Sequence, residues 1–399
     1  MMNLQIPLDI PDVEIKSTKD FYICHQCGKE AKKIHGYGEV VILQHLSILG
    51  QKVFIRIRPA RYECYYCDDK TTTTEQASWY NRRSRFTKAY EEYLMRMLIN
   101  STVRDVSRKE DVSFDAIEGV LNRQIERKVD WDSMDRLNLI GLDEISLKKG
   151  HKDFIAIIST IINGTIKILA ILGDRKKETV KTFLTSIPGK LKSTVKIACC
   201  DMYDGYINAV KEVFGKQVKG VIDRFYVAKN DRKATDSLRK SELKRLKKEL
   251  TEVEYKKLKC AMWALRKKEN DLTDEEKNVL AILFNDSPIL EQAYNFQNSL
   301  TGIFDQNIDK KAASKLIKQW VIKICNSELI CFDKFISTLN NNWDDILNYF
   351  YRKGRKNSGF IEGLNNKVKV IKRRCYGIFN IGKLFQRIFL DLEGYAKFQ

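Results

Sequence analysis

The spacing of hydrophobic and polar positions changes along the chain, and between residues 137 and 228 short runs of β-branched residues are typical of strands. Asn163-Gly164 lies between two of these runs, and this dipeptide is the preferred turn of a two-residue hairpin. Apolar residues at helical spacing predict two helices, at Lys177–Ile187 and Tyr206–Phe214. The strands that we predict cover Leu137–Leu142, Phe154–Ile162, Thr165–Leu172, Val195–Cys200 and Val218–Ile222.

The order of these elements is three strands, helix, strand, helix and strand, and a mixed sheet that begins in this way is the RNase H-like arrangement. Three of the strands end at acidic residues, namely Asp143-Glu144, Asp201 and Asp223. Sites in open α/β sheets form at the carboxyl ends of strands. We therefore expect a multidomain α/β protein with a site at this edge of the sheet in residues 137–228.

Residues 229–350 predict an all-α region, because Lys, Glu, Leu and Ala dominate there. Thr273 followed by Glu276 predicts a capping box, and Ser287-Pro288 predicts another helix start. The segment 351–399 then follows. Between Arg352 and Arg374 it holds nine basic residues and a single acid, Glu362.

Two Cys-x2-Cys pairs, Cys24 with Cys27 and Cys64 with Cys67, are separated by 36 residues. Each pair lets two thiolates reach one ion from a tight turn, and two pairs complete a tetrahedral zinc site. The β-rich segments between them predict a zinc ribbon in residues 1–80, with strands at Val40–Leu43, Leu46–Gly50 and Val53–Ile57. Four unrelated thiols are the plain alternative, and the possible substitute ligands are His25, His35 and His45.

Residues 81–136 predict three short helices, of which the first covers Tyr90–Asn100, while Ser101 and Ser113 cap the second and third. The last two helices, joined at Asp111, resemble a helix-turn-helix motif whose second helix enters the DNA major groove. Candidate DNA contacts on that helix are Ser113, Asn122 and Arg123. The segment holds twelve basic and eleven acidic residues, so charge does not favour DNA binding over a plain helical bundle.

Composition identifies the class of partner. The chain has 399 residues, enough for two to four domains, and 43% hydrophobic residues exclude a mainly disordered protein. Lys and Arg number 71 against 52 Asp and Glu, and a net charge of +19 predicts an anionic partner. We expect a cytoplasmic protein, because the start is not a signal peptide and Asn163-Gly164 interrupts the longest apolar run.

The acidic residues suit metal-dependent phosphodiester chemistry. Cleavage and strand transfer need an activated water or 3′-hydroxyl and a stabilised leaving oxygen, and two Mg²⁺ ions can serve both needs. Such hard ions prefer carboxylate ligands. Asp143 and Asp201 end strands that are neighbours in an RNase H-like sheet, and Glu362 would supply a third carboxylate from a helix. Glu144 and Asp223 are rival ligands, and each acid could instead be an ordinary turn or surface residue.

The helix that carries Glu362 would also contact DNA. Asn366, Lys369 and Arg373 follow Glu362 at offsets of four, seven and eleven, so all four share one face. Together with Arg374 they would hold backbone phosphates next to the metal site.

Several stretches together resemble the ISL3 family of bacterial insertion-sequence transposases. They are the paired Cys-x2-Cys ribbon, the helix-turn-helix, and the segments LIGLDEISLKKGH, VIDRFYVAKN, MWALRKKENDLTDEE and GFIEGLNNKVKVIKRRCYG, in family order. The resemblance implies a nucleoid-associated bacterial DDE transposase that acts on double-stranded DNA at the ends of its own element, as a dimer or higher oligomer. It also implies that an RNase H-like catalytic core, in residues 137–228 and 351–399, is interrupted by an all-α insertion at 229–350. It places the acidic triad on Asp143, Asp201 and Glu362.

One position departs from the family pattern, since Cys200 precedes Asp201 where the family more often has arginine, and Asp204 is a minor rival. Two other functions remain open at this point. A non-catalytic zinc and helix-turn-helix regulator would not need all three carboxylates, and a general RNase H-type nuclease would not need a DNA-binding N-terminal half.

Overall fold

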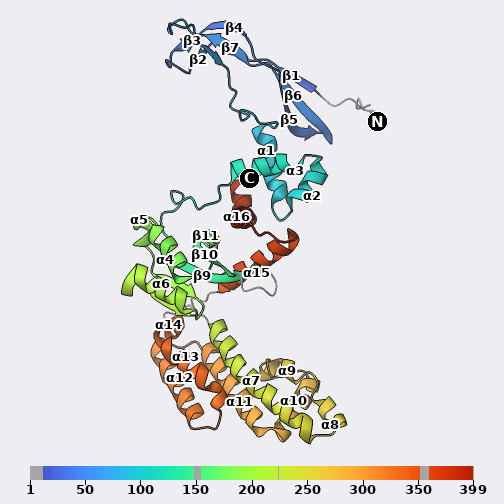
Figure 1. The fold of residues 1–399 in the computed structure, drawn as a ribbon, viewed down its shortest axis with the longest axis vertical. Coiled ribbons are helices and arrows are strands. Elements are labelled where there is room, and N and C mark those ends of the chain that lie inside the picture. Colours follow the sequence, from blue (N-terminus) through green and yellow to red (C-terminus); the bar gives the residue numbers. More distant parts are fainter. Residues whose placement is uncertain (1–11, 148–153, 223, 351–358, 399) are drawn as a thin grey trace. The chain divides into compact units, whose positions relative to one another are not determined.

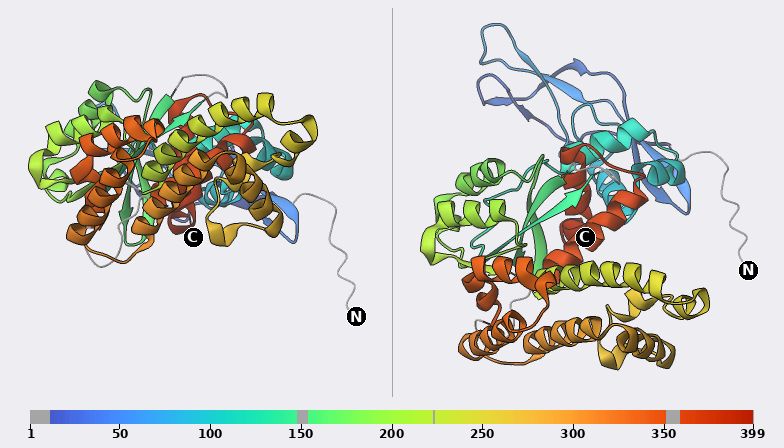
Figure 2. Two further views of the ribbon diagram at one scale, coloured as in Figure 1. Left: turned by 90° about the horizontal axis from the view of Figure 1, so that it is seen from below. Right: turned by 60° about the horizontal axis from the view of Figure 1, so that its bottom comes forward.

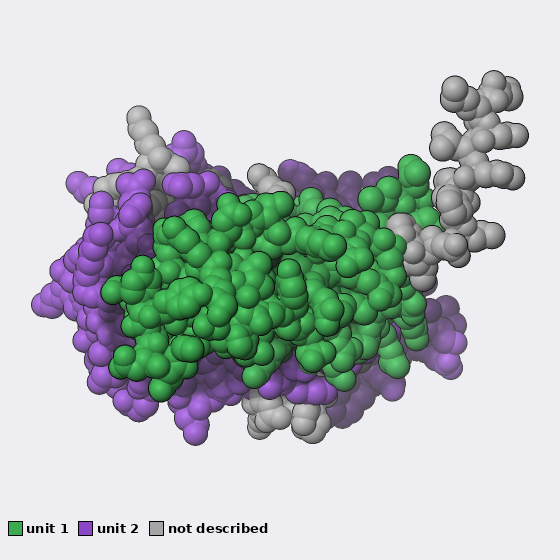
Figure 3. Space-filling model, turned by 90° about the horizontal axis from the view of Figure 1, so that it is seen from above, with its two compact units in different colours: residues 1–126, 389–399 green, residues 127–388 purple. Residues whose placement is uncertain are grey.

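The computed structural model describes residues 12–147, 154–222, 224–350 and 359–398 (Figure 1). They form two compact units, residues 1–126 with 389–399 and residues 127–388, coloured separately in Figure 3. Asp223, a rival metal ligand in the sequence analysis, lies outside the described residues. Within the described ranges, no helix has the length and apolar character needed to cross a membrane.

The first unit begins with three small sheets. One has the order β1-β6-β5, a second has β4-β7-β8, and β2 pairs with β3. The predicted strands Val40–Leu43 and Leu46–Gly50 are one strand, because the chain turns only at Leu49 and Gly50, which have φ of 51° and 80°. The bounds are β1 Asp12–Ile15, β2 Tyr22–Ile23, β3 Glu30–Ala31, β4 Lys33–Tyr37, β5 Val41–Ile48, β6 Gln51–Ile57, β7 Ala60–Glu63 and β8 Thr72–Thr74.

Three helices follow, α1 Lys88–Leu98, α2 Val103–Glu110 and α3 Phe114–Gln124. The predicted cap of α2 was one residue early, since the hydroxyl of Thr102, not Ser101, accepts the Asp105 backbone N–H. Asp111 ends α2 in the left-handed conformation, and Ser113 caps α3, as predicted. Apolar residues of all three helices share one core with Leu390 and Phe398.

The second unit is built on a five-stranded mixed sheet of order β11-β10-β9-β12-β13. Neighbours among β11, β10 and β9 are antiparallel, and β12 pairs parallel with both β9 and β13. The strands are β9 Leu139–Ser146, β10 Phe154–Ile162, β11 Thr165–Leu172, β12 Ile197–Cys200 and β13 Lys219–Ile222. Asn163 and Gly164 form the predicted turn, with φ of 50° and 79°.

Strand β9 is longer than predicted, so Asp143 lies inside it and not at its end. Its antiparallel partner β10 continues to pair as far as Ser146 with Phe154, which keeps the strand extended. Its parallel partner β12 stops at the pair Leu142–Cys200. Asp143 is therefore the first β9 residue beyond the parallel pairing, next to where Asp201 follows β12.

Helices cover the sheet and extend into a large helical region (Figure 2). The capping box at Thr273 and Glu276 and the proline start at Pro288 are present as predicted. The helices beside the sheet are α4 Lys177–Ser186, α5 Gly189–Lys192, α6 Asp204–Phe214 and η1 Gly215–Gln217. The helical region comprises α7 Arg224–Glu249, α8 Glu252–Lys257, α9 Ala261–Ala264, η2 Glu269–Asp271, α10 Asp274–Asp286, α11 Pro288–Asp305, α12 Lys310–Cys325, η3 Ile330–Phe332, α13 Asp333–Asn341, α14 Trp343–Leu347 and η4 Asn348–Phe350.

Two last helices follow, α15 Gly359–Arg374 and α16 Ile381–Lys397. Helix α15 packs closely on β9 because Gly141 has no side chain. A Cβ atom added at Gly141 would lie 2.7 Å from Phe360 Cζ and 2.9 Å from Ile361 Cδ1, much closer than carbon atoms pack. This glycine therefore sets the distance between α15 and the centre of the sheet.

Helix α7 carries a buried carboxylate. Asp231 is 1% exposed, and neither of its oxygens has a hydrogen-bond partner among the described residues. The Thr235 hydroxyl, one turn further along α7, is in the same condition. Burial raises the pKa of Asp231 from 3.8 to about 7, and the Arg232 charge opposes the rise. On η3, the half-buried Cys331 is close enough for Asp231 to raise the pKa of its thiol.

We predict that Gly141→Ala destabilises the protein by about 1–3 kcal/mol, because the new methyl group must push Phe360 and Ile361 away from the strand. Urea unfolding measures the change. Gly363→Ala, on the same helix but with open space around its added Cβ, is the matched control. It should be neutral or stabilising by up to about 1 kcal/mol. Equal effects of the two changes would refute the close-packing argument.

We also predict that stability falls as the pH rises, because the folded state holds the Asp231 proton more tightly than the unfolded state. This contribution is complete below the unfolded pKa of 3.8 and is lost as the pH passes about 7. Asp231→Asn should stabilise the protein at pH 8 by at most about 4 kcal/mol and should have no effect at pH 4. Unfolding curves across this pH range, with the exposed Asp271→Asn as control, test the prediction. A variant that is less stable than the wild type at pH 8 contradicts it.

Candidate metal and DNA-processing sites

The four cysteines of the ribbon converge in unit 1. The sulfurs of Cys24, Cys27, Cys64 and Cys67 all lie within 4.8 Å of one another, and they form the one group of His, Cys, Asp or Glu side chains in the described ranges that is placed to hold a metal ion. The backbone N–H groups of Cys27 and Gln26 lower the pKa of Cys24 to about 6. The turn thus stabilises a thiolate, the form that binds zinc.

The histidines have other partners. A ring nitrogen of His25 lies 3.0 Å from the Thr73 hydroxyl, and one of His35 lies 3.0 Å from a Glu63 carboxylate oxygen. His45 contacts the Thr87 hydroxyl at 2.8 Å. The cysteine group therefore needs no histidine, and its four sulfurs match a tetrahedral zinc site.

The predicted DNA contacts on α3 differ in their surroundings. Asn122 is exposed, and Ser113 accepts the Ala116 N–H as the helix cap. Arg123 donates to the fully buried Glu91 at 2.6 Å, so its guanidinium balances a buried carboxylate within unit 1. The exposed surface of this helix is consequently less basic than its sequence suggests.

In unit 2 the carboxylate of Asp143 is 5% exposed and is held by three donors. Its Oδ1 accepts the Glu144 backbone N–H at 2.7 Å, and its Oδ2 accepts the Tyr226 hydroxyl at 2.6 Å. The side-chain amide of Asn365 on α15 also donates to Oδ2. Burial raises the pKa of Asp143 in spite of these hydrogen bonds.

Asp201 follows β12 beside Asp143. The pKa of Asp201 is raised to about 6, mainly by burial and also by the charges of Asp143 and Glu144, while the Tyr203 backbone N–H and the Lys229 charge oppose the rise. Asp143 and Asp201 are the residues that directly follow the last parallel pair of β9 and β12, Leu142 with Cys200, so they lie at the same end of these neighbouring strands. Asp204, the minor rival, is the exposed first residue of α6.

The rival Glu144 has a partner of its own. Arg175 donates to Glu144 at 2.5 Å, and its guanidinium lies 4.6 Å and 4.8 Å from the ring centres of Phe154 and Tyr203. This ion pair neutralises Glu144 and favours Asp143 over Glu144 as a metal ligand.

Helix α15 presents two kinds of surface along its length. Glu362, Asn366, Lys369 and Arg373 are all exposed, as the predicted common face requires, and Arg374 is partly buried. At the edge of this face Lys372 donates to the backbone oxygens of Ser146 and Leu147 at 2.6 Å and 2.9 Å. Asn365 and Lys372 thus tie the same edge of α15 to successive parts of β9.

A divalent cation suits the groups around Asp143. Asp143 is buried, Asp201 is partly buried, and both have raised pKa values, so a cation beside them would relieve unfavourable charge burial. The buried Oδ1 of Asn365 has no hydrogen-bond partner among the described atoms. Carboxylate and amide oxygens are the ligands that hard divalent ions take. The three candidate carboxylates do not by themselves form a closed metal cluster in the described structure.

Sequence reasoning missed Tyr226 and Asn365. Both belong to segments that were singled out, VIDRFYVAKN and GFIEGLNNKVK, but a tyrosine and an asparagine carry no metal-site signal alone. Their position among acidic strand ends and a basic helix is the signal that could have identified them.

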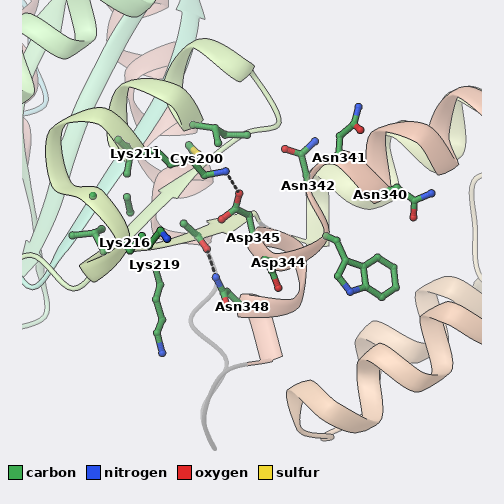
Figure 4. A pocket seen from close by; sticks show the side chains of 17 residues that line it. Cys200, Lys211, Lys216, Lys219, Asn340, Asn341, Asn342, Asp344, Asp345 and Asn348 are labelled. Atoms are coloured by element: carbon green, nitrogen blue, oxygen red, sulfur yellow. Dashed lines mark hydrogen bonds and ion pairs between the residues drawn. The ribbon is translucent and has the colours of Figure 1, made fainter.

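Figure 4 shows a separate cavity of about 630 Å³ between the β12–β13 edge and helices α13 and α14. Lys211, Lys216 and Lys219 line one side, and none of the three candidate carboxylates lines it. Lys211 pairs with Asp345 at 3.2 Å, and Asn348 donates to the Gly220 carbonyl at 2.9 Å. The cavity therefore marks the attachment of the helical region to the edge of the sheet.

Known families match successive parts of this chain. A family described as Transposase matches residues 140–388, the helix-turn-helix domain of transposase family ISL3 matches 75–125, and the zinc-finger of transposase IS204/IS1001/IS1096/IS1165 matches 21–67. The chain is also similar to the transposase for insertion sequence element IS1001 from Bordetella parapertussis. The two are 23% identical over 389 residues, which cover 96% of this chain and 92% of the relative.

These matches confirm the predicted zinc ribbon, helix-turn-helix and transposase domain. The zinc-finger match agrees with the cysteine geometry and supports a structural zinc ion. The transposase match implies a divalent metal such as Mg²⁺. A transposase domain over most of unit 2 also argues against a non-catalytic regulator.

We predict about one zinc ion per chain, and a loss of zinc in Cys64→Ser because one of four tetrahedral ligands is removed. The melting temperature should fall as well, since zinc binding contributes directly to folding. Cys325→Ser, at an exposed cysteine on α12, is the control and should keep both zinc and stability. Metal analysis of the purified proteins decides the question. Full zinc content in Cys64→Ser would rule out the site.

Proposed function

Because the chain belongs to the ISL3 family of transposases, we propose that it cleaves DNA at the ends of its own insertion sequence and joins them to a target. Asp143, Asp201 and Glu362 are the proposed metal-binding carboxylates. The observation that carries this assignment is the adjacency of Asp143 and Asp201 at the carboxyl end of the parallel strand pair β9–β12. Glu362 is exposed on α15, the helix that Asn365 ties to Asp143.

The proposed catalytic core is RNase H-like and is interrupted by the all-α region. The strand order β11-β10-β9-β12-β13 and its mixture of antiparallel and parallel pairs support this assignment. The proposed domains are a zinc ribbon at 1–80, a helix-turn-helix at 81–136, a core at 137–228 and 351–399, and the insertion at 229–350.

Each part of the site has a distinct task. Bound divalent ions supply an activated nucleophile and stabilise the leaving oxygen. The chain's own residues hold Asp143 in one orientation, keep Glu144 neutralised by Arg175, and present Lys369 and Arg373 toward solvent beside the carboxylates. Those two cations bind backbone phosphates and carry no sequence information.

The N-terminal half selects the DNA. We assign recognition of the element's ends to helix α3, with the exposed Asn122 as a base contact and Ser113 as a phosphate contact. Arg123 supports this helix through Glu91. Paired ends require at least two copies of the chain, so we propose a dimer or higher oligomer on DNA, and association with the nucleoid follows from DNA binding.

The catalytic prediction is that Asp143→Asn, Asp201→Asn or Glu362→Gln lowers Mg²⁺-dependent cleavage of the terminal repeats by orders of magnitude. Each change keeps the size of the side chain and removes the charge that binds the metal. Binding to the same DNA should persist, because the proposed phosphate contacts lie elsewhere. Cleavage assays with a parallel binding assay measure both effects, on variants with unchanged melting.

Asp271→Asn provides the control, an exposed acidic residue on η2 that belongs to neither proposed DNA-binding helix. It should cleave as the wild type does. Normal cleavage by Asp143→Asn or Glu362→Gln would show that the triad is misassigned. If Asp223→Asn abolishes cleavage while Asp201→Asn does not, the second carboxylate belongs to the end of β13.

The DNA-binding prediction separates α15 from α3. Replacing Lys369 and Arg373 with alanine should weaken binding to all DNA sequences alike and should reduce the slope of log affinity against log salt by about two. Asn122→Ala should weaken binding to the terminal repeats more than to unrelated DNA. Fluorescence anisotropy at several salt concentrations distinguishes the two effects. A loss confined to terminal repeats in the α15 variant would mean that this helix reads bases.

A further inference from the structure

The amide of Asn365 uses only half of its hydrogen-bonding capacity. The side chain is 9% exposed, and its Nδ2 donates to Asp143 Oδ2. Its Oδ1 is buried and has no hydrogen-bond partner among the described atoms. A buried amide oxygen without a partner costs about 1–3 kcal/mol, so such an atom in a native fold needs an explanation.

The Asp143 carboxylate has two hydrogen-bond donors besides Asn365. Asp143 Oδ2 also accepts the Tyr226 hydroxyl at 2.6 Å, and Oδ1 accepts the Glu144 N–H at 2.7 Å. A leucine of similar size at 365 would have packed against β9 without an unsatisfied oxygen. The surroundings of Asn365 therefore give no structural reason for a buried amide oxygen at this position.

We propose that Asn365 is a further ligand of the catalytic divalent cation, through its Oδ1. This inference rests on the proposed function of Asp143. A half turn of the amide exchanges its oxygen and nitrogen without changing its shape, and it would place Oδ1 against Asp143 Oδ2. Two oxygens bonded at right angles to one Mg²⁺ ion lie about 3 Å apart, which is a hydrogen-bond separation.

The two orientations of the Asn365 amide correspond to the site without a cation and the site with one. Without a cation, the amide N–H stabilises the Asp143 carboxylate. With a cation, the positive charge replaces that N–H, and the amide oxygen becomes a neutral ligand beside the carboxylate. The next residue, Asn366, is exposed on the adjacent face and is not tied to Asp143, so the assignment is to one of the two neighbouring asparagines.

Mn²⁺ titration calorimetry on the full-length, zinc-loaded protein tests the proposal without DNA or turnover. Asn365→Leu, which keeps the volume but removes both polar atoms, should weaken Mn²⁺ binding at least tenfold. Tyr226→Phe removes the other donor to the same oxygen and should weaken Mn²⁺ binding clearly less than Asn365→Leu does, because it leaves every proposed ligand in place. Equal losses in the two variants would make Asn365 only a hydrogen-bond donor, and wild-type affinity in Asn365→Leu would overturn the proposal. Melting curves without added metal confirm that each variant folds.

Cysteine substitution gives a second, spectroscopic readout. Cobalt bound by a thiolate shows charge-transfer absorption, so Co²⁺ added to zinc-loaded Asn365→Cys should give a band that the wild type lacks. Asn366→Cys is the matched control and should give none. A band in neither variant, or in both, would contradict the placement of residue 365 in the metal's coordination sphere.

Asp143→Asn separates the failure of this inference from that of the proposed function. If Asp143→Asn abolishes Mn²⁺ binding while Asn365→Leu leaves it intact, the site stands and Asn365 is not its ligand. If Asp143→Asn binds Mn²⁺ normally, the proposed metal site itself is wrong, and the ligand assignment falls with it.

Discussion

The burial of the Asp143 carboxylate is the constraint on which the catalytic half of the molecule depends. A charge at the centre of a sheet is unfavourable unless donors or a cation surround it. Here the side-chain donors come from Tyr226 at the start of α7 and Asn365 on α15, which are 83 and 222 residues away in sequence. The hydrogen bonds of this one side chain therefore link three segments, which are β9, the start of α7 and α15. The helical region between α7 and α15 can vary as long as both helices still contact Asp143.

Close packing allows those donors to reach the carboxylate. Gly141 lies two residues before Asp143 on β9, and α15 occupies the space that a side chain there would need. Lys372 then fixes the other end of the contact by donating to Ser146 and Leu147 beyond Asp143. The strand and the residue after it contribute a glycine, a carboxylate and two carbonyl oxygens in sequence, and each meets a matching group on one helix.

Local signals in the sequence were enough to predict much of the fold. The hairpin at Asn163-Gly164, the cap at Thr273 and the two cysteine pairs each depend on residues close together in the chain, so their patterns are visible without the structure. The length of β9 depends on its pairing with β10, and the roles of Tyr226 and Asn365 depend on tertiary contacts. The pairing of Arg123 with Glu91 could not be predicted for the same reason, because nothing near Arg123 in sequence shows that Glu91 is buried beside it.

Under the proposed function, helix α15 serves both metal and DNA. Residues 362, 366, 369 and 373 recur at intervals that keep them on one exposed face, while Asn365 and Lys372, two turns apart, lie along its boundary with the sheet. A phosphate held by Lys369 or Arg373 would thus lie on the same helix as Glu362 and within two turns of the amide that contacts Asp143. Because the helix is rigid over this length, a change in how α15 packs on β9 would move the phosphate contacts and the Glu362 carboxylate together. Under the proposed function, the coupling between DNA binding and catalytic geometry would be a property of how α15 packs on β9.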